Sequence, residues 1–130
     1  MKILLAEDDF VTRKFMTGFL SKYGECDVTV DGMEAVDAFM LALEEEEPYD
    51  LVCLDIMMPV MDGYQALMGI RNLEKERNIP KEQEAKVIMT TALNDEKNVK
   101  MAFDLGCTVY SGKPIDQDRF EQVLKKFGLI

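Results

Sequence analysis

The sequence predicts an α/β domain with a doubly wound, five-stranded parallel sheet, helices on both faces and the flavodoxin-like strand order 2-1-3-4-5. Short apolar runs alternate along the chain with stretches of helical period. The runs lack an in-and-out alternation, which is typical of strands covered on both faces. Their connections are short, so right-handed crossovers would place helices on both faces of the sheet. The runs lie at residues 3–6, 28–30, 51–54, 87–89 and 108–110.

A helical segment follows each apolar run. Two of them carry apolar residues at i, i+3, i+4 and i+7, which is typical of helices with one buried face. A third has apolar residues at four-residue steps, and glycines are expected to cap three of the helices. Asp95 and Asp116 stand where N-caps are expected. The apolar positions are Val11, Phe15, Phe19 and Tyr23; Val36, Phe39, Met40 and Leu43; and Phe120, Val123, Leu124 and Phe127, with Gly24, Gly106 and Gly128 as the expected caps.

Two connections differ from the rest in composition or length. We expect the acidic run Glu44–Pro48 to be a solvated loop, because its charges oppose the negative end of a helix and proline stops helix propagation. The stretch Glu74–Lys86 exceeds the usual two to six residues of such a connection. We interpret it as an extra helical turn and a charged surface insertion.

Composition narrows the possible functions. The length of 130 residues predicts a single domain, 1–130, with no output domain. The 25 acidic and 15 basic residues give a net charge of −10, which disfavours binding to nucleic acid and to anionic membranes. The absence of histidine removes Ser-His-Asp triads and His-based zinc sites. The three cysteines form no CxxC pair and are expected in a reduced core. No apolar run is long enough for a signal peptide or membrane span, so we expect a cytoplasmic protein.

Acidic residues follow two of the predicted strands. Glu7, Asp8 and Asp9 come after the first apolar run, and Asp55 comes directly after the third. If these strands are neighbours, the carboxylates converge, and they repel one another unless a cation lies between them. An all-oxygen site suits Mg²⁺ or Mn²⁺. For Asp9 alone we favour a simpler role at the positive end of the following helix.

Hydroxyl and ammonium groups are expected at the same edge of the sheet. Thr90 and Thr91 end the fourth predicted strand, and Lys113 follows the fifth. A lone threonine is usually a β-former and a lone lysine is usually solvated. Together with the acids, however, they supply a carboxylate nucleophile, a cation site and donors for phosphoryl oxygens, which are the parts needed for phosphoryl transfer.

This ordered set resembles the receiver domain of response regulators in two-component signalling, the CheY-like fold, and the resemblance covers the chain from Met1 to the last helix. It implies that Asp55 accepts a phosphoryl group from a sensor histidine kinase or a phosphotransfer protein. It also implies an Mg²⁺ ion, with Mn²⁺ able to substitute, held by Asp8, Asp55, the carbonyl of Met57 and, through water, Glu7. The matching pieces are Glu7-Asp8, Asp55, Met58-Pro59, Met61-Asp62-Gly63, Thr91-Ala92, Tyr110 and Lys113-Pro114.

The resemblance further implies a switch rather than an enzyme, with only intrinsic self-phosphorylation and autodephosphorylation. Thr91 would bind the phosphoryl oxygen, Lys113 would pair with the carboxylate or phosphate, and Tyr110 would move inward. The Lys113–Pro114 bond is expected to be cis. The downstream protein target is expected on the face formed by the fourth helix, fifth strand and fifth helix.

Two apolar neighbours of the pocket, Met57 and Leu93, stand where some receivers have polar side chains. We hypothesise a comparatively long-lived aspartyl phosphate, because apolar groups hinder water and offer it no hydrogen bond.

Three alternatives compete with this interpretation. An aspartate-nucleophile phosphatase needs a second Asp two residues after the nucleophile, where this chain has Met57. A flavin or nucleotide site needs an anion cradle where this chain has acids, and neither GxGxxG nor a Walker A loop is present. A pseudo-receiver that binds partners without phosphorylation ranks below the active form, because every matched position is filled.

Overall fold

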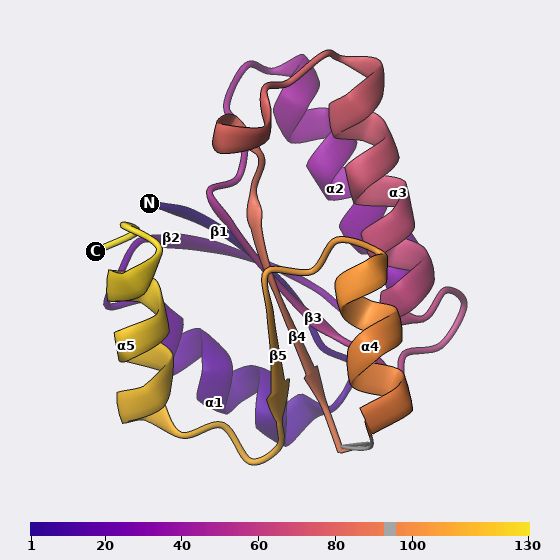
Figure 1. Ribbon diagram of the computed structural model, residues 1–130. Helices are drawn as coiled ribbons and strands as arrows, with labels where there is room; N and C mark the ends of the chain where they lie inside the picture. Colours follow the sequence, from indigo (N-terminus) through magenta and orange to yellow (C-terminus); the bar gives the residue numbers. More distant parts are fainter. Residues whose placement is uncertain (93–95) are drawn as a thin grey trace.

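The structure, a computed structural model, describes residues 1–92 and 96–130 (Figure 1). Over these ranges five parallel strands lie in the order β2-β1-β3-β4-β5, which confirms the predicted fold class. Helices α1 and α5 cover one face of the sheet, and α2, α3 and α4 cover the other. The elements are β1 (Lys2–Ala6), α1 (Phe10–Leu20), β2 (Glu25–Thr29), α2 (Gly32–Glu44), β3 (Leu51–Asp55), α3 (Gly63–Glu76), the 3₁₀ turn η1 (Lys81–Gln83), β4 (Lys86–Thr91), α4 (Glu96–Asp104), β5 (Val109–Gly112) and α5 (Gln117–Lys126).

Each face of the sheet has its own apolar core. Alternate residues of β1, such as Ile3 and Leu4, enter opposite layers, so the central strands are buried on both sides. Strands β2 and β5 lie at the edges and are only partly covered. The expectation of full cover on both faces is therefore wrong for these two strands.

The core face of α1 differs from the predicted one. Met16, Phe19 and Leu20 are buried, whereas Val11 is 73% exposed and Phe15 is 45% exposed. At about 100° per residue each four-residue step turns by about 40°, so residues at three such steps cannot all face the sheet. In α2 the buried residues are Ala35, Phe39 and Ala42, so the face turned to the core is displaced from the predicted one, and the predicted core residue Met40 is 38% exposed.

The predicted caps are confirmed in part. Gly106 and Gly128 adopt positive φ angles of 102° and 72° after their helices, and Asp116 accepts a hydrogen bond from the Arg119 amide at 3.1 Å. Gly24 does not cap α1, which ends at Leu20; a Cβ on Gly24 would instead collide with the Met1 carbonyl. Asp95 lies outside the described residues.

The expectations about the acidic run and the cysteines are confirmed in part. The run Glu44–Pro48 is exposed and is loop from Glu45 on, whereas Glu44 is the last residue of α2. The three cysteines are free thiols; Cys53 and Cys107 are buried, and Cys26 is half-buried. Within the described ranges, no helix is both long and apolar enough to cross a membrane.

The connection between α3 and β4 is anchored by a buried ion pair. The extra helical turn is confirmed, because α3 continues to Glu76. Glu74 is only 1% exposed and accepts hydrogen bonds from Arg71 at 2.7 Å and from the Ala85 amide at 2.8 Å. Arg71 also donates to the carbonyls of Ala85 and Gly106, each at 2.9 Å. Residues 77–84 are exposed or half-buried, as expected of a surface insertion, and the buried carboxylate of Glu74 ties the end of this connection to α3.

Candidate functional site

Carboxylates gather at the carboxyl end of the two central strands. Ala6 of β1 pairs with Leu54 of β3, so the residues that follow each strand meet at one edge. One carboxylate oxygen from each of Glu7, Asp8 and Asp55 lies within 4.8 Å of the others. Glu7 and Asp55 are buried, whereas Asp8 faces solvent. The predicted convergence of acids is therefore observed, with Asp55 as the last residue of the strand itself.

Lys113 lies between two of these carboxylates. Its Nζ is 2.9 Å from Glu7 Oε2 and 3.1 Å from Asp55 Oδ1. Its amide donates to the Thr91 carbonyl at 2.8 Å, which fastens the loop after β5 to the end of β4. The Lys113–Pro114 bond is cis, as expected. One cation thus offsets part of the repulsion between two buried acids.

The local charges shift the proton affinities at this edge. Burial and the neighbouring charge of Glu7 raise the pKa of Asp55 to about 6, although Lys113 acts in the opposite direction. Burial alone would lower the pKa of Lys113, but its hydrogen bond to Glu7 and the charge of Asp55 outweigh this effect and raise it. The pocket therefore keeps Lys113 charged. Ionisation of Asp55 costs free energy there, and a bound cation would lower that cost.

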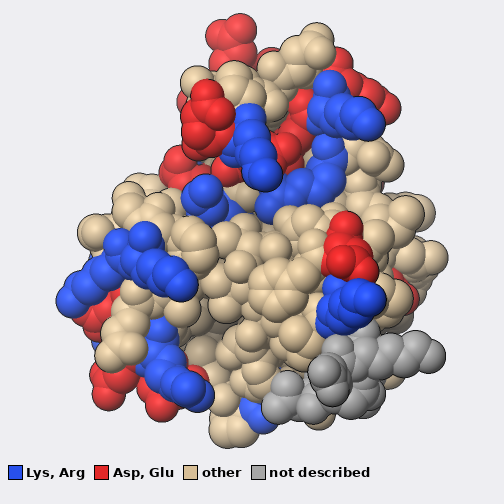
Figure 2. All heavy atoms as spheres, in the orientation of Figure 1, with Lys and Arg blue, Asp and Glu red and all other residues tan. Residues whose placement is uncertain are grey.

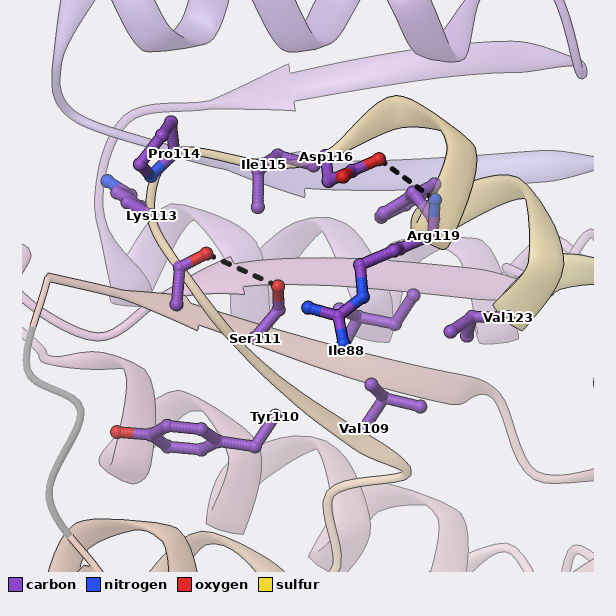
Figure 3. A pocket seen from close by; sticks show the side chains of 12 residues that line it. Ile88, Val109, Tyr110, Ser111, Lys113, Pro114, Ile115, Asp116, Arg119 and Val123 are labelled. Carbon is purple, nitrogen blue, oxygen red and sulfur yellow. Dashed lines mark hydrogen bonds between the residues drawn. The ribbon is translucent and has the colours of Figure 1, made fainter.

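The remaining predicted residues lie around this cluster. Thr91 is fully buried at the end of β4, one residue beyond Thr90, which pairs with Asp55. Tyr110 is half-buried and packs against the core on the α4 side of β5. The fold thus brings Glu7, Asp8, Asp55 and Lys113 into contact range and sets Thr91 beside them. Tyr110 stands apart, on the other side of the strand from Arg119 (Figure 3).

Two residues at the start of α1 hold the backbone next to the carboxylate cluster. Asp9 is its N-cap and accepts from the Thr12 amide at 2.9 Å, which confirms the simpler role expected for it. Arg13 was missed by sequence reasoning; its Nη1 donates to the carbonyls of Glu7 at 3.0 Å and Asp8 at 3.2 Å. Arginine in the first turns of a helix is too common to indicate such a contact.

The loop from β3 to α3 borders the pocket. Asp62 and Gln65 form a capping box that starts α3. A Cβ on Gly63 would collide with the Asp55 carbonyl, so the helix can approach the strand end only through glycine. Met57 is 62% exposed and carries no proton for a general acid, and Leu93 lies outside the described residues.

A hollow of about 550 Å³ lies between β5 and α5 (Figure 3). Its floor is apolar, with Ile88 and Val109, and Val123 contributes from α5. The Arg119 side chain reaches across it toward Ser111 (Figure 3). Lys113 and Pro114, from the loop after β5, also line the hollow.

Comparison with known proteins identifies the class. The family model of the response regulator receiver domain matches residues 3–125, so the chain belongs to that family of signalling domains. It is 32% identical over 124 residues to the probable transcriptional regulator ycf29 of Porphyra purpurea, covering 95% of this chain and 54% of that protein. The curated relatives that match most of this chain are longer, and the chain spans between 5% and 54% of their length.

Solved structures agree with this assignment. The chain is similar to the CheX-CheY-BeF3-Mg²⁺ complex from Borrelia burgdorferi, with a TM-score of 0.82 and 32% identity over 98% of this chain and 89% of that one. It shares its fold with the Ssk1 receiver domain of Saccharomyces cerevisiae, solved with the phosphotransfer protein Ypd1, at a TM-score of 0.83 and 23% identity over 98% and 88% of the two chains. Receiver domains bind Mg²⁺ at an acidic pocket, and the three clustered carboxylates here form the oxygen donor set that Mg²⁺ prefers.

Proposed function

We propose that Asp55 accepts a phosphoryl group from a sensor histidine kinase or phosphotransfer protein in a Mg²⁺-dependent reaction. The phosphorylated chain then acts as a stand-alone cytoplasmic switch that changes which proteins it binds. The observation that carries the proposal is the buried Asp55 carboxylate, 3.1 Å from Lys113 Nζ and clustered with Glu7 and Asp8. In the transfer, the phosphorus–nitrogen bond of the donor breaks and a phosphorus–oxygen bond to Asp55 forms. The imidazole nitrogen keeps the electron pair.

Each residue of the site has a proposed role in binding the metal ion or the phosphoryl group. Asp8, Asp55 and the Met57 carbonyl would hold Mg²⁺, Glu7 would act through water, and Mn²⁺ could substitute. When bound, the ion supplies positive charge that lowers the repulsion between the carboxylates and the incoming phosphate. Lys113 and Thr91 supply an ammonium and a hydroxyl to phosphoryl oxygens, contacts that strengthen once phosphate adds roughly −1.5 to −2 charges.

Intact mass after incubation with acetyl phosphate and Mg²⁺ tests the acceptor. We expect one phosphate adduct on the wild type and none on Asp55→Asn, because asparagine lacks the nucleophilic oxygen. The exposed Asp104→Asn on α4 is the matched control and should keep the adduct. An adduct on Asp55→Asn would contradict the assignment of the acceptor. No adduct on the wild type, with or without Mg²⁺, would favour a pseudo-receiver.

The lifetime of the aspartyl phosphate tests the role of Met57. We expect a half-life well beyond seconds in the isolated protein, because the exposed thioether of Met57, two residues after Asp55, cannot orient an attacking water. Met57→Asn should shorten it several-fold by offering water a hydrogen bond. The half-life is read from the loss of the adduct after the phosphodonor is removed. Decay of the wild type within seconds would contradict the hypothesis.

For the output we propose the face formed by α4, β5 and α5. Three features support it: the position of Tyr110 on β5, the exposed Met101 and Phe103 on α4, and the hollow beside Arg119. Figure 2 shows this face as largely uncharged over β5, with basic side chains over α5. Movement of Thr91 toward the phosphate would draw Tyr110 inward and change this surface. The net charge of −10 supports a protein target rather than nucleic acid or a membrane.

A further inference from the structure

The turn between β1 and α1 carries three consecutive acids, and their carboxylates are held in different ways. The Glu7 carboxylate accepts hydrogen bonds from Lys113 Nζ at 2.9 Å and from the Asp9 amide at 3.1 Å. The Asp9 carboxylate accepts from the amide and the hydroxyl of Thr12, at 2.9 and 2.7 Å. The Asp8 carboxylate is exposed and has no hydrogen bond or ion pair within residues 1–92 and 96–130. Its direction therefore depends on the backbone of Asp8 rather than on contacts of its own.

Arg13 holds the backbone on both sides of Asp8. Its Nη1 atom donates to the Glu7 carbonyl at 3.0 Å and to the Asp8 carbonyl at 3.2 Å. These two carbonyls belong to the peptide units that precede and follow the Asp8 Cα atom. Because each peptide unit is planar, holding both of them restricts the φ and ψ angles of Asp8 and the direction of its Cα–Cβ bond. One side chain thus controls where the Asp8 carboxylate can point.

The Arg13 side chain is itself attached to a well-packed helix. Arg13 lies near the start of α1, and its amide donates to the Asp9 carbonyl at 2.8 Å. It is half-buried, and its guanidinium carbon lies 5.6 Å from the centroid of the Phe10 ring. The opposite side of α1 packs into the core through Met16 and Phe19. Helix α1 is therefore a firm support from which Arg13 reaches back to the turn.

The charge of Arg13 opposes the cation binding that its hydrogen bonds favour. Arg13 forms no ion pair with a carboxylate in the part of the chain that the structure describes, whereas Lys113 lies between Glu7 and Asp55 and offsets their repulsion. A guanidinium next to the clustered carboxylates repels an incoming cation, so by its charge alone Arg13 would weaken Mg²⁺ binding. Positioning and charge therefore predict changes of opposite sign in Mg²⁺ affinity when Arg13 is replaced.

We propose that Arg13 is a positioning residue of the Mg²⁺ site. It holds the peptide units on both sides of Asp8 and so directs the Asp8 carboxylate toward those of Glu7 and Asp55 before the ion binds. Ligands arranged in advance bind more tightly, because less ordering accompanies binding. Residues that orient metal ligands without touching the metal change the affinity by about tenfold or more. The inference rests on the proposed function and adds a residue that contacts neither the ion nor the phosphoryl group.

The test measures Mg²⁺ affinity directly. Arg13→Met removes the donors and the charge but keeps an unbranched side chain, and Arg13→Lys keeps the charge but replaces the planar guanidinium with a compact ammonium. The matched control Lys14→Met removes an equal charge from the next residue of α1, whose side chain forms no hydrogen bond to the turn within the described ranges. The Mg²⁺ dissociation constant is read from amide shifts in NMR spectra during titration with MgCl₂ at constant ionic strength. Urea unfolding in EDTA and phosphate uptake from acetyl phosphate are measured in parallel.

We expect Arg13→Met to weaken Mg²⁺ binding about tenfold and Arg13→Lys to weaken it less, whereas Lys14→Met should stay within about twofold of the wild type. The proposal is overturned if Arg13→Met binds Mg²⁺ as tightly as the wild type or more tightly, or if Lys14→Met loses as much affinity as Arg13→Met. If Arg13→Met does not fold, wild-type affinity in Arg13→Lys overturns the proposal instead. A wild type without saturable Mg²⁺ binding overturns it as well. A wild type that binds Mg²⁺ but takes up no phosphate from acetyl phosphate overturns the proposed function and leaves the role of Arg13 standing.

Discussion

Replacement of Asp55 by asparagine is expected to stabilise the metal-free protein at pH 7 by about 2–3 kcal/mol, while it abolishes phosphorylation. Burial and Glu7 raise the pKa of this carboxyl from an ordinary value of 3.8 to about 6. A shift of that size corresponds to about 3 kcal/mol at neutral pH, at about 1.36 kcal/mol for each tenfold change in proton affinity. Asparagine removes the buried charge and keeps the shape. The acceptor position is thus a place where function opposes stability.

The pH dependence has a definite sign. Because the folded state binds a proton at Asp55 more tightly than the unfolded state does, the folded wild type is favoured at low pH, and this contribution is lost as the pH rises from about 4 to about 6. The Asp55→Asn variant lacks this titration. Its advantage over the wild type should therefore be near zero at pH 4 and full above pH 7. Urea unfolding at both pH values, in EDTA, measures the difference.

Two comparisons make this result interpretable. Asp104→Asn removes an exposed carboxylate and should change the free energy of unfolding by less than about 0.5 kcal/mol at either pH. Mg²⁺ should raise the stability of the wild type more than that of Asp55→Asn, because it binds the folded carboxylate cluster. The account is contradicted if Asp55→Asn is less stable than the wild type at pH 7. It is also contradicted if the difference in unfolding free energy between the two proteins is the same at both pH values.

Truncation of Glu74 to alanine is expected to destabilise the protein by about 3 kcal/mol. The variant would leave Arg71, whose side chain is 17% exposed, without its carboxylate partner, and the buried Ala85 amide would lose its acceptor. Breaking a buried ion pair from one side costs about 3–5 kcal/mol, and the partial exposure of Arg71 places this case at the lower end. Chemical denaturation at pH 7 measures the loss.

Glu76→Ala is the matched control for this prediction. Glu76 lies two residues further along α3, at the exposed end of the helix. Its removal should change stability by no more than about 0.5 kcal/mol. If Glu74→Ala and Glu76→Ala unfold at the same urea concentration, the buried pair does not hold the start of β4 in place.

The fold class and most of the site follow from the order of residues along the chain. Apolar runs and helical periods are local properties, and the parallel sheet follows from their alternation. Glu7, Asp8, Asp55 and Lys113 can be grouped from their positions in the sequence, because each follows or ends a strand and the carboxyl ends of parallel strands share one edge. The N-cap role of Asp9 depends only on its place before a helix.

Which charged and apolar side chains face inward depends instead on tertiary packing. Glu74 resembles its exposed acidic neighbours in the sequence, yet its carboxylate is satisfied by Arg71, one turn earlier in α3, and by the Ala85 amide, directly before β4. Val11 and Phe15 follow an apolar pattern, but the crossing of α1 over the sheet selects Met16, Phe19 and Leu20 for the core. Local spacing specifies a helix and its periodicity, whereas burial depends on the direction from which the rest of the chain packs against it.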